Sequence, residues 1–292
     1  MMLITCIPMY TESNMHVFIT AIQKRFKRWD RRVALSKRQQ LVVITLILTL
    51  GLVMTQMVST DLRYIFVVIL SFLAYGLSAF GLREDLKGIE WITLLTLPTF
   101  FTGAIALFYF LLPVRWLTRV PVAVLYALGM YALLLTENIY NVAANRTIGL
   151  LRAAHSVGFL LTLVTYFLLV QTALSFRFPF YISTLVIGLV SFFLVLQCLW
   201  AMELEVKLST RLVQISIATT LALIQLSWAL TFWPVKLTIL SLFLTTCFYS
   251  MVGMAQQYLV ERLYKKTIVE FFVVSFIVFL LMILTTHWRG NY

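Results

Sequence analysis

Apolar residues occur in nine long runs along this chain, and charged residues or prolines interrupt the chain between them. A helix needs about 20 mostly apolar residues to cross the hydrocarbon core of a bilayer. The pattern therefore predicts an all-α, polytopic transmembrane helix bundle with nine spans, or eight as the alternative. The expected spans are 41–58, 64–81, 91–112, 120–136, 153–173, 180–201, 212–233, 237–258 and 268–286.

Short polar segments connect these runs, so consecutive helices are expected to pack as antiparallel neighbours. No connection is long enough to form a soluble catalytic domain. We therefore expect three parts: a basic arm over residues 1–40, the bundle over residues 41–286, and a short tail over residues 287–292.

The arm has its own pattern over about residues 15–35, where apolar residues recur every three or four positions and basic residues lie between them. Such a pattern predicts an amphipathic helix in the membrane interface that binds anionic lipid headgroups. The alternative interpretation is a topology anchor that binds no particular partner. The residues expected at the interface are Phe18, Ile22, Lys24, Arg25, Phe26, Lys27, Arg28, Trp29, Arg31 and Arg32.

Composition excludes a soluble fold, because 62% of the 292 residues are hydrophobic, only 12% are charged and the mean hydropathy is +0.96. The net charge of +12 could suggest nucleic-acid binding, but the basic residues lie between the apolar runs and not on one soluble face. Basic loops are typical of the cytoplasmic side. We therefore expect no nucleic-acid partner.

The distribution of Lys and Arg also predicts an orientation. With a cytoplasmic N-terminus, seventeen of the 23 basic residues lie inside, eight of them in the arm, and six lie outside. We expect the N-terminus inside and the C-terminus outside, with no cleavable signal, in a plasma membrane of the bacterial type. The six outside residues are Arg63, Arg115, Arg119, Arg177, Lys236 and Arg289.

Known catalytic and metal-binding patterns are missing from the sequence. The three cysteines and three histidines are scattered, without the spacing of a disulfide framework or a metal site. Phosphate-binding loops, dinucleotide-binding glycine motifs and nucleophile elbows are also absent. We therefore expect no metal and no cofactor.

The most polar stretch near membrane depth follows the fourth span. Glu137, Asn141 and Asn145 would form one stripe on a continuing helix. An ionisable group inside a span usually has a function, but a carboxylate at a helix end can also be solvated or hydrogen-bonded between helices. A Glu137–His155 pair could handle protons. The candidate polar site is Glu137, Asn138, Asn141, Asn145, Arg146, Arg152 and His155.

Amides within or at the ends of the spans are expected to form hydrogen bonds between helices. They are Gln171, Gln197, Gln225, Gln256 and Gln257.

These features leave three functional hypotheses open. The first is a non-enzymatic membrane scaffold, assembly factor or partner-binding component, with a membrane protein or a second copy of the chain as candidate partner. The second is a carrier or lipid-handling transporter with its site at the polar stripe, which a recurring Glu near the ends of the fourth, sixth and eighth spans also favours. The third is an intramembrane enzyme on a lipid-linked substrate, with Glu137 or Glu203 and His155 as acid and base.

Overall fold

A computed structural model describes residues 36–57, 62–83, 89–112, 116–143, 149–205 and 208–286. The chain divides into two units, Met1–Gln40 and Leu41–Tyr292, and the interfacial helix expected in the arm lies outside the described residues. The regular elements in the described ranges are nine α-helices. They are α2 (Lys37–Thr55), α3 (Arg63–Leu82), α4 (Glu90–Tyr109), α5 (Trp116–Ala143), α6 (Leu151–Ser175), α7 (Phe180–Glu203), α8 (Thr210–Leu230), α9 (Leu237–Leu259) and α10 (Lys265–Leu284).

Every one of these nine helices is long and apolar enough to cross a membrane. For the described residues, the structure confirms the expected helix number, and most helix ends lie close to the predicted ones. The chain thus has the elements of a multi-pass membrane protein.

The clearest difference from the expected spans is in α5, which runs over 28 residues from Trp116 to Ala143. The expected fourth span ended at residue 136, because polar residues follow it in the sequence. The helix continues because Glu137 and Asn141 find hydrogen-bond partners on other helices. A hydropathy pattern cannot detect such partners.

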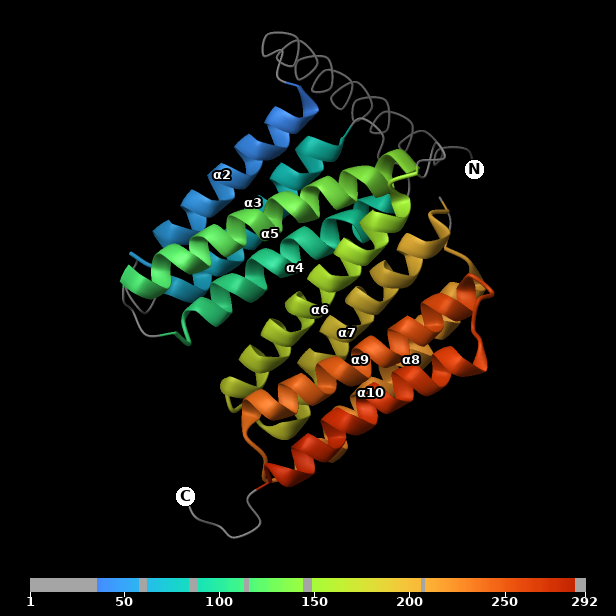
Figure 1. Cartoon of the computed structure of the whole chain (residues 1–292). Helices are drawn as coiled ribbons and strands as arrows, with labels where there is room; N and C mark the ends of the chain where they lie inside the picture. The colour runs from blue at the N-terminus through green and yellow to red at the C-terminus, as the bar shows by residue number, and fades with distance from the viewer. Residues whose placement is uncertain are drawn as a thin grey trace, which may run out of the picture. The chain divides into compact units, whose positions relative to one another are not determined.

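Helix hairpins form the framework of the bundle, as the short connections predict. α3 packs against α4, α7 against α8, and α9 against α10. α6 joins these pairs, since it contacts α4, α5, α7 and α9 (Figure 1). Residues near the ends of α5, α7 and α9 are therefore brought close to the start of α6.

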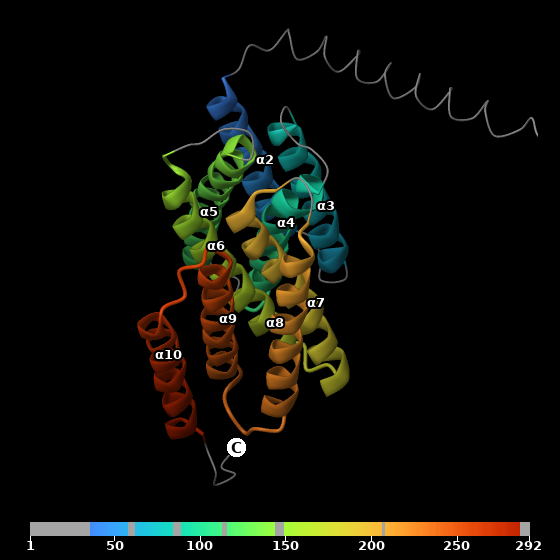
Figure 2. The same ribbon diagram turned by 90° about the vertical axis from the view of Figure 1, so that its right-hand side faces the viewer.

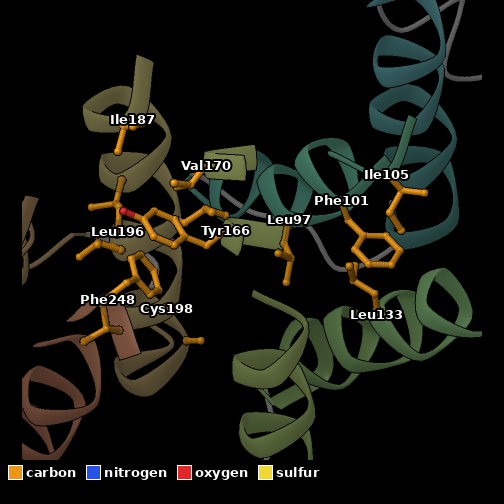
Figure 3. Packing of buried hydrophobic residues seen from close by; sticks show 14 of the residues in the cluster. Leu97, Phe101, Ile105, Leu133, Tyr166, Val170, Ile187, Leu196, Cys198 and Phe248 are labelled. Atoms are coloured by element: carbon orange, nitrogen blue, oxygen red, sulfur yellow. The ribbon is translucent and has the colours of Figure 1, made fainter. Parts of the chain in front are cut away.

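Aromatic side chains pack the centre of the bundle (Figure 3). Tyr166 of α6 stacks on Phe248 of α9, with ring centroids 4.2 Å apart, and its hydroxyl lies 3.1 Å from the Ser191 hydroxyl of α7. In another part of the same core, Phe101 of α4 lies near Leu133 of α5. In a bilayer, close packing and interhelical hydrogen bonds drive such association, because lipid tails are as apolar as the side chains.

Candidate functional site

Five polar side chains from four helices lie at the end of the bundle where α5, α7 and α9 finish and α6 begins. Glu137 and Tyr140 come from α5, His155 from α6, Gln197 from α7 and Gln256 from α9. We call these five residues the polar cluster. The central contacts of α6 bring the four helices together there.

Glu137 is the most deeply buried member of the polar cluster, with 0% of its side chain exposed. Its Oε1 accepts a hydrogen bond of 2.9 Å from Nε2 of Gln197 on α7. Glu137 thus forms a hydrogen bond between helices and is not solvated at the end of its helix. A carboxyl group removed from water is costly unless it is hydrogen-bonded, so the Gln197 amide stabilises it.

The bond between Glu137 and Gln197 leaves two oxygen atoms unused. Oε2 of Glu137 and Oε1 of Gln197 are both buried, and neither has a hydrogen-bond partner within the described ranges. Both atoms are acceptors when the carboxyl group is ionised. The pair can therefore accept a further hydrogen bond from a donor such as water.

Asn141 lies one turn beyond Glu137 on the same face of α5, as the stripe predicts. Its Nδ2 donates a hydrogen bond of 2.9 Å to the backbone oxygen of Leu82, the last residue of α3. Carbonyl groups in the last turn of a helix lack an intrahelical donor, so Asn141 satisfies one of them. Asn138 is half-buried on the same helix.

His155 forms its hydrogen bond with the backbone of α7. Its Nε2 lies 2.8 Å from the oxygen of Ala201, which can only accept, so Nε2 carries the proton. The His155 ring lies 5.5 Å from the ring of Tyr140, whose hydroxyl donates to the oxygen of Ala154. Glu137 and His155 thus bond to different parts of α7, and no hydrogen bond between the two groups is present among the described residues.

The remaining candidates are not part of the polar cluster. Arg152 is exposed in the first turn of α6. Asn145 and Arg146 lie outside the described residues, as do the ten residues expected at the membrane interface.

Glutamine amides connect several helices, as expected from the sequence. Besides Gln197, Gln256 donates to the backbone oxygen of Cys198, and Gln171 of α6 accepts from Ser241 of α9. Gln225, in contrast, is exposed on α8. The sequence identified the amides, but not that Gln197 belongs with Glu137, since these residues are far apart along the chain.

The cavity at the polar cluster is small, with a volume of about 10 Å³, roughly enough for one water molecule. Ligand pockets usually have volumes of about 300–1,000 Å³. Two larger hollows of about 690 and 590 Å³ lie elsewhere and have almost entirely apolar walls, one between α3, α4 and α6, the other between α7 and α8. Within the described residues, no group of three or more His, Cys, Asp or Glu residues could hold a metal ion.

Comparison with known proteins matches most of the chain, including the polar cluster, to one protein family. A sequence model of the family described as "Protein of unknown function (DUF5656)" matches residues 81–285, which include α4 to α10 and hence the polar cluster. No curated protein and no solved structure matches the chain. Because the match covers well over half of the 292 residues, the chain belongs to the DUF5656 family.

Proposed function

We propose that this chain is a non-enzymatic, partner-binding scaffold of a membrane, and that α10 is the helix that binds the partner. The observation that carries the proposal is the packing of α10. Only Met282 is buried among the 20 residues of this helix. In Figure 2, α10 lies at the edge of the bundle beside α9.

The attachment of α10 to the bundle is through α9. The hydroxyl groups of Ser250 and Ser275 lie 2.6 Å apart, and Phe271 packs over Gly253, where no side chain intervenes. Phe279 also packs against Phe243 of α9 and Trp233, and the exposed surface of α10 is mostly apolar. On that surface Phe272 and Phe276 stack on each other with 68% and 48% of their side chains exposed.

A carboxylate marks the exposed surface of α10. Glu270 is exposed and lies about 8 Å along the helix axis from Lys265, the first residue of α10. This distance from the helix end places Glu270 at the edge of the hydrocarbon region. Ionisable groups at this depth usually face protein or water, because lipid does not solvate them. A partner helix with a basic residue opposite Glu270 and apolar residues opposite the two phenylalanines fits this surface.

Two further observations support a scaffold over a carrier or an enzyme. The groups of the polar cluster hydrogen-bond to other helices, and the cavity beside them is too small for a substrate. In addition, the DUF5656 match extends to residue 285 and so includes all of α10, although this helix contributes little to the core.

We also propose a cytoplasmic N-terminus and an external C-terminus in a plasma membrane. The excess of Lys and Arg in the segments on the N-terminal side supports this orientation. The basic arm would then bind anionic headgroups of the inner leaflet.

Site-specific photo-crosslinking in cells tests the role of α10. We expect a benzophenone side chain at Phe272 to give one discrete adduct with another membrane protein. The same probe at Leu46 of α2, which is also exposed, should give none. The joint change Phe272→Ala and Phe276→Ala should lower co-purification of that protein about tenfold or more, because large buried aromatics dominate interfaces.

The control for the joint change is Leu46→Ala with Leu50→Ala, which removes apolar area from an exposed face of α2. Equal loss of the co-purified protein with both double variants would contradict a specific site on α10. The proposal would also be wrong if neither probe position gave a protein adduct.

The carrier remains the second candidate, because the unused oxygens of Glu137 and Gln197 are an observation that favours it. A proton-coupled carrier needs a carboxyl group that gains and loses a proton. Proteoliposomes with an internal pH dye separate the two functions. A carrier predicts a proton flux that Glu137→Gln abolishes, whereas a scaffold predicts the same dye signal with and without the change.

A further inference from the structure

The exposed face of α8 has a pattern that lipid alone does not explain. Exposed residues recur along this helix at alternating spacings of three and four, the heptad pattern of helices that pack against a parallel partner. Two of these residues carry amides. The exposed stripe consists of Arg211, Gln214, Ala218, Leu221, Gln225 and Trp228.

The opposite face of α8 already packs inside the bundle. Leu212, Ser216 and Leu223 are among its buried residues, and α8 contacts α7 and α9. Figure 2 shows α8 at the surface of the bundle, between these two helices. The middle of the exposed stripe is therefore available to a second protein surface. At its ends, the Arg211 guanidinium lies over the Tyr258 ring of α9, and Trp228 packs edge-on against Phe180 of α7.

Gln225 is the key residue of the exposed stripe, because its position in the membrane is unfavourable for an isolated amide. α8 has 21 residues and is about 31 Å long, close to the hydrocarbon thickness, and Gln225 lies about 8 Å from its end at Leu230. Within the described ranges, the Gln225 amide has no hydrogen-bond partner. Gln171, Gln197 and Gln256, by contrast, bond to neighbouring helices.

We propose that α8 is the interface of a homodimer, in which the exposed stripe packs against the same stripe of a second copy. Two copies with the same membrane orientation are related by a two-fold axis along the membrane normal, which brings equal residues face to face. A glutamine amide both donates and accepts, so Gln225 is the hydrogen-bond complement of Gln225 in the second copy. Ala218 is small and lets the two backbones approach closely.

The hollow between α7 and α8 adds to this interface. Its volume is about 590 Å³, and its walls include Leu221 and Trp228 of the exposed stripe together with Leu185 and Leu189 of α7. All four of these side chains are exposed. Apolar side chains of the second copy would fill the hollow next to the paired amides, which extends the contact beyond a single helix.

Disulfide crosslinking of the full chain in native membranes tests the register. Cys6 is replaced by serine, and the two other cysteines, Cys198 and Cys247, are buried. A single cysteine is then introduced at Ala218, Leu221 or Gln225, and the membranes are treated with an oxidant. We expect a covalent dimer at all three positions. The control is Ala222→Cys, which is next to Leu221 but off the exposed stripe, and should not crosslink.

Dimerisation measured by energy transfer between labelled copies in phosphatidylcholine liposomes tests the amide. Gln225→Leu should weaken the dimer about three- to thirty-fold, the range for an interhelical amide bond in a membrane. Gln225→Asn retains the amide and should recover part of the loss. The matched control is Gln171→Leu in α6, because Gln171 bonds within one copy and should leave the dimer constant unchanged.

Three results would overturn the proposal. The first is a monomer in liposomes at all protein densities. The second is a dimer that crosslinks through cysteines on α2 or α10 but not through those on α8. The third is a dissociation constant of the dimer that Gln225→Leu leaves unaltered. Because the proposed partner of the scaffold binds α10, failure of the α8 dimer leaves the α10 experiment unaffected.

Discussion

The pair of Glu137 and Gln197 illustrates what a single residue contributes to this bundle. Removing one member of a buried hydrogen bond leaves the other unpaired, which costs about 1–3 kcal/mol. We expect Glu137→Leu to destabilise the protein by about that amount, and Glu137→Gln by much less, because an amide oxygen can still accept from Gln197. Thermal unfolding in detergent, compared between the two variants, measures the difference. Equal destabilisation would show that the hydrogen bond to Gln197 does not account for the loss, because glutamine has nearly the same volume as glutamate and retains the acceptor.

Residue types in the sequence were enough to select Glu137 and Asn141 as candidates, since polar groups beside an apolar run are conspicuous. Their partners could not be predicted, because Gln197 and the Leu82 carbonyl come from other helices, and only the packing of the bundle brings them close. His155 shows the same limit. The sequence allowed a pair with Glu137, but Nε2 of His155 hydrogen-bonds to the backbone oxygen of Ala201.

Glu261 provides a second prediction at the residue scale. It follows α9 with a backbone φ of 58°, in the left-handed region that costs a non-glycine residue about 1–2 kcal/mol. Its side chain is exposed. Glu261→Gly should therefore raise the free energy of unfolding by up to about 1 kcal/mol. The control is Arg262→Gly, the next residue, which is outside that region and should give no gain. A loss of stability in Glu261→Gly would refute this interpretation.

At the scale of helices, the sequence was most informative about where each helix lies along the chain. The ranges expected for α7 and α9 differ from the structure by at most two residues at each end. The sequence was least informative about how much of each helix is buried. α7 and α10 are both strongly apolar, yet α7 lies in the core and α10 buries one residue, because hydropathy does not distinguish lipid from protein as surroundings.

The contact of α10 with α9 can be tested without altering α10 itself. A Cβ atom at Gly253 would lie 2.6 Å from the ring of Phe271, so Gly253→Leu should push the helices apart at a cost of about 1–3 kcal/mol. We expect faster amide exchange in α10 and unchanged exchange in α3. Gly76→Leu is the matched control, because nothing lies within 4 Å of a Cβ atom there. Unchanged exchange in α10 of Gly253→Leu would mean that this contact does not hold the helix.

For the whole molecule, orientation in the membrane is the property on which the proposed functions depend. With a cytoplasmic N-terminus, Gly149 before α6 lies inside and Lys236 before α9 lies outside, and both are exposed. A membrane-impermeant maleimide added to intact cells should therefore label Lys236→Cys and not Gly149→Cys, in a chain with Cys6 replaced. Replacing the eight basic residues of the arm with glutamine leaves nine basic residues inside against six outside. The excess of Lys and Arg on one side of the membrane directs insertion, so part of the population should then insert the other way round. Gly149→Cys should become labelled in that part, and Lys236→Cys should stay labelled only in the rest. Unchanged labelling after this replacement would show that the loops of the bundle orient the protein without the arm. Labelling of Gly149→Cys alone in the chain with an intact arm would show that the orientation is the reverse of the proposed one.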